Sequence, residues 1–161
     1  MYHWDKCLLN GKVSRMGSVV GAVGRGIVAG VAGTAALTLS EKLEQSLTKR
    51  PTSMVPAQVG AKVANVEPKS GAGAEKLNWA VHWGHGVTMG AVRGLLGATA
   101  LSAPVASILH LPLVWGGDAA LYTTLGIAPA PWKWGGQELA TDLWHKGVLS
   151  VATSLVFIAL D

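Results

Sequence analysis

The sequence has little charge and almost no cysteine. Charged residues make up 14% of the chain, and Cys7 is its only cysteine. A water-soluble domain usually carries about 25% charged residues, because its surface has to be solvated. A single cysteine excludes an intrachain disulfide and any metal site built from several cysteines. These deficits argue against a soluble domain and against a small disulfide-stabilised one.

The chain also lacks a strongly basic surface. Its net charge is +4, and its Lys and Arg residues flank apolar segments. Flanking charge of this kind is typical of signals for membrane topology, or of contact with anionic lipid. We therefore expect the lipid bilayer as a partner and no nucleic acid.

Long apolar segments take the place of the missing charge. Half of the residues are hydrophobic, and most of them fall in four stretches of the chain. A helix of about 20 apolar residues crosses a hydrocarbon core of about 30 Å. The sequence predicts an all-α, polytopic membrane protein with one membrane domain, residues 1–161. The expected spans are about 17–39, 77–101, 105–127 and 137–160, with a loop at 48–76.

Two local features qualify this plan. Residues 57–66 predict a short interfacial helix within the long loop. Pro112, Gly116 and Gly117 interrupt the third span, and Asp118 lies inside it. Because proline removes a backbone donor and crowds the preceding turn, we expect the third helix to be broken near Pro112–Asp118.

The predicted bundle has two ends. The loop end contains residues 48–76, and the terminal end contains both chain termini, because the number of crossings is even. More Lys and Arg residues lie at the loop end, which favours a cytoplasmic loop end. The basic residues before the first span favour the opposite orientation. The orientation of the termini is therefore left open.

Glycines recur at helix-packing intervals. On the first two spans they stand four residues apart, at Gly26, Gly30, Gly86, Gly90 and Gly94. A dinucleotide-binding motif would need a strand before its glycines, and none precedes these. Small residues four apart allow two membrane helices to approach closely. We expect these glycines to form a helix–helix contact.

Ionisable residues gather at the loop end. The second span begins with His82 and His85, and the last begins with Glu138, Asp142 and His145. Asp118 and Tyr122 approach from the third span and complete a polar cluster. By contrast, Arg25 and Arg93 lie near the terminal end, where we expect them to extend towards water.

Three interpretations of the loop-end cluster stay open. The residues could lie in the wet interface, or they could handle a proton or a substrate. Alternatively, His82, His85, Asp142 and His145 could bind a divalent metal ion, since residues three apart project to one side of a helix. Haem or pigment is a less favoured cofactor, because the histidine spacing does not suit it.

Part of the sequence resembles a known family. The residues that carry the resemblance are His110–Pro112, Leu125–Trp132, Glu138, His145 and the glycine-rich Ala29–Thr34. With them the chain resembles the YagU-like inner-membrane proteins of bacteria, a family without an established biochemical activity. The resemblance implies a multi-pass protein of the inner membrane and no known reaction.

Three functions follow in order of preference. The first is a small binding or transport-like membrane protein, assembled as a homo-oligomer, with its polar cluster near one membrane face. The second is an accessory subunit of a larger membrane complex. The third is a metal-dependent membrane enzyme, placed last because the sequence shows no nucleophile–base pair and no phosphate-binding loop.

Overall fold

The protein is helical. The computed structural model describes residues 3–66 and 71–161, with side chains from Ser18 onward. In these residues it contains five α-helices, one 3-10 turn and no strand. The elements are α1 (His3–Thr48), α2 (Val55–Ala64), α3 (Ala72–Gly97), α4 (Ala103–Thr124), η1 (Pro131–Lys133) and α5 (Gly136–Leu160). The all-α prediction is confirmed, and α2 occupies the segment where a short helix was expected.

Proline and left-handed residues set several helix boundaries. Pro56 and Pro104 occupy the first turns of α2 and α4, where the missing N–H costs no hydrogen bond. Asn65 ends α2 in the left-handed conformation, with φ 52°. Gly126 has φ 65° just after α4, in a region that favours glycine. These residues turn the chain at the end of α2 and after α4.

Helix α4 corrects one prediction. It runs without interruption from Ala103 to Thr124, with Pro112 inside it, so the expected break near Pro112–Asp118 is wrong. A proline removes only one N–H from the helix ladder, and packing against neighbouring helices can hold the remaining turns in place. Val114 and Asp118 of α4 are both buried, which shows that this part of the helix is packed on its neighbours.

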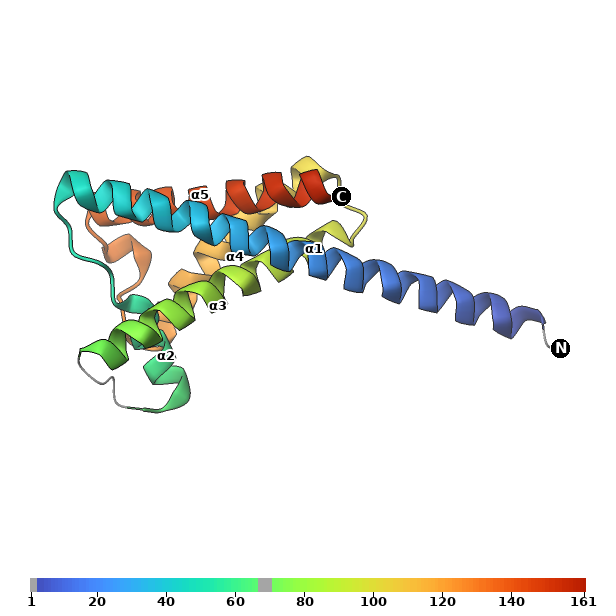
Figure 1. Cartoon of the computed structure of the whole chain (residues 1–161), viewed down its shortest axis with the longest axis horizontal. Helices are drawn as coiled ribbons and strands as arrows, with labels where there is room; N and C mark the ends of the chain where they lie inside the picture. The colour runs from blue at the N-terminus through green and yellow to red at the C-terminus, as the bar shows by residue number, and fades with distance from the viewer. Residues whose placement is uncertain (1–2, 67–70) are drawn as a thin grey trace.

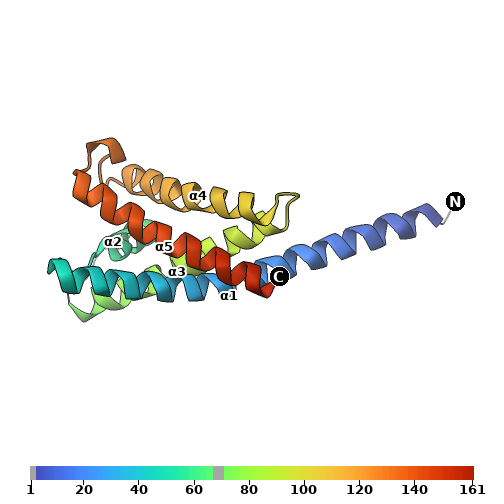
Figure 2. The same cartoon turned by 90° about the horizontal axis from the view of Figure 1, so that it is seen from above.

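The four long helices run alongside one another in alternating directions (Figures 1 and 2). Helix α1 packs against both α3 and α5, α4 packs against α5 and α3, and α2 packs against α3. The first part of α1 projects beyond the other helices (Figure 1). The loop end of the bundle contains α2, η1 and the beginnings of α3 and α5. The terminal end contains the connection between α3 and α4 and the C-terminus.

Within the residues that the structure describes, two helices are long and apolar enough to cross a membrane. They are the part of α1 from Ser18 to Thr48 and α5 from Gly136 to Leu160. Helices α3 and α4 do not meet the same test of length, hydropathy and charge. Membrane crossings by α3 and α4 therefore stay predictions.

The bundle buries many polar side chains and exposes many large apolar ones. Five of its seven largest fully buried side chains are polar, among them Arg93, His110 and Thr34. The outer surface carries large aliphatic residues, such as Leu39 and Ile108, each 72% exposed. In the described part of the chain, large exposed apolar side chains occur on α1, α3, α4 and α5. This distribution suits a bundle whose surroundings are apolar.

A glycine seam joins α1 to α3. We use this name for Gly26 and Gly30 of α1 with Gly86, Gly90 and Gly94 of α3. A Cβ atom added to Gly30 would lie 2.8 Å from the Gly90 Cα, and one added to Gly26 would lie 2.9 Å from the Gly94 Cα. The two backbones therefore approach more closely than any larger residue would permit. All five predicted packing glycines lie in this contact.

Candidate ligand cavity at the loop end

A cavity of about 700 Å³ opens at the loop end. All five α-helices and the segment before α5 contribute to its wall. Its ionisable lining residues are Glu41, Lys42, Arg50, His82, His85, Asp118, Tyr122, Glu138, Asp142, His145 and Lys146. Every loop-end residue that the sequence predicted as a site therefore lines one cavity.

Helix α2 is fixed as one wall of this cavity by a buried amide. The Asn78 Nδ2 donates to the Ser53 carbonyl at 3.1 Å, and the Ala57 N–H donates to the Asn78 Oδ1 at 3.0 Å. Both groups of one α3 side chain are thus used to hold the chain that leads into α2. Because the amide is buried, these hydrogen bonds are costly to break.

Asp118 is the centre of a buried ion-pair cluster. Its Oδ1 accepts a hydrogen bond from the His85 Nε2 at 2.7 Å, and its Oδ2 pairs with the Lys146 ammonium. Lys146 also donates to the Tyr122 hydroxyl at 3.4 Å. The Asp118 side chain is 5% exposed and that of Lys146 is 12% exposed. Helix α3 supplies one member of this cluster, α4 supplies two and α5 supplies one, so the cluster joins the three helices.

His82 belongs to a separate hydrogen-bonded chain. The Thr38 hydroxyl donates to the Thr34 carbonyl at 2.8 Å, and its oxygen lies 2.9 Å from the His82 Nε2. Since the hydroxyl proton is already used, the Thr38 oxygen accepts from the His82 N–H. His82 is therefore oriented by α1.

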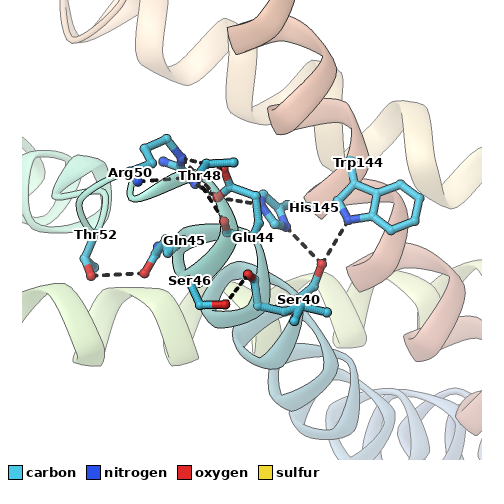
Figure 3. Close-up of polar contacts among 10 residues, drawn as sticks. Ser40, Glu44, Gln45, Ser46, Thr48, Arg50, Thr52, Trp144 and His145 are labelled. Atoms are coloured by element: carbon cyan, nitrogen blue, oxygen red, sulfur yellow. Dashed lines mark hydrogen bonds and ion pairs between the residues drawn. The ribbon is translucent and has the colours of Figure 1, made fainter.

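His145 joins a third group, at the contact between α5 and α1 (Figure 3). The Ser40 oxygen lies 3.2 Å from the His145 Nδ1 and accepts from the Trp144 indole N–H at 3.0 Å. The His145 Nε2 lies 3.7 Å from the Glu44 Oε2 and has no hydrogen-bond partner. Among the described residues this buried ring nitrogen therefore faces a carboxylate at a distance too long for a hydrogen bond.

Glu44 is paired with Arg50. The Arg50 Nη2 donates to the Glu44 Oε2 at 2.8 Å, and its Nε donates to the same oxygen at 3.1 Å. This hydrogen bonding raises the pKa of the Arg50 guanidinium above its ordinary value. Arg50 is therefore a permanent cation whose charge is already matched by a carboxylate.

The four predicted metal ligands do not converge. His82 and His85 bond to Thr38 and Asp118, and His145 lies against Ser40. In the part of the chain that the structure describes, no group of three or more His, Cys, Asp or Glu residues is placed to hold a metal ion. Helix α1 packs against both α3 and α5, so the His82 and His145 side chains each meet α1 first. The cavity does not have the form of a metal centre.

Lys146 and Glu41 line the cavity but were not among the predicted site residues. Lys146 stands four residues after Asp142, so a helical register alone would have placed it on the predicted polar face. Glu41 stands with Glu44 at the loop end of the first predicted span, so its position along the chain already placed it near the other ionisable residues.

Arg93 contradicts the expectation for the terminal end. It is completely buried instead of extending to water. Its Nε and Nη2 donate to the hydroxyls of Ser154 and Ser107, each at 3.2 Å, and its guanidinium carbon lies 4.5 Å from the centre of the Phe157 ring. The Nη1 atom has no hydrogen bond. Arg25 behaves closer to expectation, since its side chain is 38% exposed and pairs with Asp161 at 2.6 Å.

His110 connects three helices in the middle of the bundle. Its Nε2 donates to the Met89 carbonyl on α3 at 2.9 Å, and its Nδ1 lies 3.0 Å from the Ser150 hydroxyl on α5. Both partners lie on neighbouring helices, so His110 joins α4 to α3 and α5.

No protein-family model, curated protein or solved structure matches this chain. The resemblance to the YagU-like proteins therefore stays a prediction.

Proposed function

We propose that this protein is an integral membrane protein with four crossings, whose loop-end cavity binds a small charged ligand. The observation that carries the proposal is a cavity lined by buried charged groups within a bundle whose outer surface is apolar. Ligand pockets typically measure about 300–1,000 Å³ and contain a few converging polar groups. The loop-end cavity has this size and this lining.

The reversed polarity of the bundle supports four crossings. Helices α3 and α4 bury Arg93, His110 and Asp118, so the polar residues that lower their hydropathy point inward. The faces that they expose carry aliphatic residues, among them Leu95 and Leu113. In a bilayer, ionisable residues within a helix face the bundle interior and mark functional pathways.

The glycine seam bears on the mode of assembly. Its five glycines are already used for the contact between α1 and α3, so they are not free to join two copies or to bind a partner subunit. We propose a homo-oligomer formed through other faces. A native-mass measurement in mild detergent tests this proposal. A homo-oligomer has the mass of several identical chains, whereas an accessory subunit would co-purify with larger proteins.

The number of crossings can be tested by cysteine labelling from outside the cell. Cys7 is first replaced by serine, and single cysteines are placed at Asn65, Ser102, Lys133 and Asp161. Four crossings place Asn65 and Lys133 on one membrane face, with Ser102 and Asp161 on the other. If only α1 and α5 cross, Asn65, Ser102 and Lys133 will all label from the same side, and the proposed topology is wrong.

A further inference from the structure

We infer that the loop-end cavity takes an organic cation, an alkylammonium ion bound between Glu41 and Asp142. This inference rests on the proposed function and names the class of its ligand. It follows from the charges that the cavity leaves unmatched, from its aromatic wall and from a buried nitrogen without a partner.

The cavity contains more negative charge than its own bases neutralise. Lys146 is paired with Asp118, and Arg50 is paired with Glu44. Among the residues that the structure describes, neither Glu41 nor Asp142 forms an ion pair. An unmatched carboxylate in a half-buried position is costly, and a bound cation would lower that cost.

Glu41 and Asp142 approach the cavity from different helices. Glu41 belongs to α1 and Asp142 to α5, and both line the cavity. Both also lie close enough to Lys146 to interact with its charge. The lining carboxylates outnumber the lining bases, which are Lys42, Arg50 and Lys146, and Arg50 is already paired with Glu44. One further positive charge would improve the balance.

Aromatic side chains favour an organic cation. Trp79, Trp134 and Tyr122 line the cavity. The Trp134 indole is held in place because its N–H donates to the Pro129 carbonyl at 2.7 Å. Indole and phenol faces attract ammonium groups, and they also cover alkyl chains. A metal ion fits less well, since no three ligand residues converge.

His145 offers a hydrogen-bond acceptor for the ammonium. The ring is 5% exposed, and its Nε2 has no hydrogen bond. When Nδ1 carries the ring proton and donates it to Ser40, Nε2 is free to accept from an N–H group. A primary ammonium has three N–H donors, so pairing with Glu41 and Asp142 leaves one for a further acceptor.

The inference is tested with three probes of similar size and different charge. The full chain is purified in mild detergent and titrated by calorimetry at pH 7.5 with n-butylammonium, butyrate and n-butanol. We expect n-butylammonium to bind at least about tenfold more tightly than the other two, a difference of about 1.4 kcal/mol. Glu41→Gln and Asp142→Asn should each weaken n-butylammonium binding about tenfold.

Glu75→Gln is the matched control, because Glu75 is exposed on α3 and does not line the cavity. It should bind like the wild type. If butyrate binds more tightly than n-butylammonium, or n-butanol binds equally well, the inference of a cationic ligand is wrong. The proposal that the cavity binds a ligand would still stand. If none of the three probes binds to a correctly folded wild-type chain, both the inference and the proposed binding function fail.

Discussion

The terminal half and the loop end of the bundle use the same helices in opposite ways. In the terminal half, glycines bring α1 and α3 into backbone contact, as at Gly30 and Gly90. At the loop end, the same two helices carry Glu41 and His82, which line a cavity of about 700 Å³. Small residues at the contact allow the helices to touch through their backbones, whereas at the loop end polar side chains such as Thr38 and His82 join them.

Each half also treats its buried charge differently. Asp118 and Lys146 neutralise each other at the loop end. Arg93, in the terminal half, is surrounded by hydroxyl groups and an aromatic ring, with its Nη1 left without a hydrogen bond. A matched pair beside a cavity suits binding, whereas a packed guanidinium suits the joining of helices. Substitutions in the two halves should separate these roles.

The largest effect is expected from breaking the buried ion pair. Asp118→Asn leaves the Lys146 ammonium without its partner, and loss of one member of such a pair costs about 3–5 kcal/mol. Thermal unfolding in mild detergent measures the loss. Adding Lys146→Met should recover much of it, because the uncompensated charge is then removed.

The control is Asp161→Asn, which breaks an exposed pair with Arg25 and should cost less than about 1 kcal/mol. Additive losses in the double variant would show that Asp118 and Lys146 do not depend on each other.

A smaller effect is expected from truncating the buried arginine. Arg93→Ala removes a fully buried side chain from between Ser107, Ser154 and Phe157. The lost packing should lower the free energy of unfolding by about 2–4 kcal/mol, as for other large-to-small changes in a core. Arg25→Ala is the comparison, because that side chain is partly exposed. Equal losses in these two variants would mean that Arg93 extends to the surface after all.

The smallest of the three effects concerns a single methyl group. Gly90→Ala adds a Cβ only 2.6 Å from the Gly30 Cα, so the helices must move apart, at a cost of about 1–3 kcal/mol. Gly84→Ala, on the same helix, meets nothing within 4 Å. It should leave stability unchanged or raise it slightly, since alanine favours the helix. Thermal unfolding of both variants in the same detergent makes the comparison. A Gly90→Ala variant as stable as Gly84→Ala would exclude a close seam at this position.

The sequence predicted the helical class and the packing glycines for a physical reason. Both depend on spacing along a single helix, as between Gly86, Gly90 and Gly94, and spacing can be read without the partner. It also placed the ionisable residues at one end of the bundle, because the direction of each helix follows from the connections. The error at Pro112 arose because a local breaking tendency was given more weight than the packing around α4.

Which residues would pair was not visible in the sequence. One face of a helix carries both His82 and His85, and one face of another carries both Asp142 and His145. This regular spacing suggested that the four residues form one site. Only the tertiary structure shows that α1 packs against both α3 and α5, so that Thr38 and Ser40 become the partners of His82 and His145. The burial of Arg93 was decided in the same way, since Phe157 and Ser154 of α5 cover it.

The sequence by itself determined which residues occupy each end, because that depends on position along a helix. Their partners were decided only by the tertiary structure, because pairing depends on how each helix is rotated about its axis.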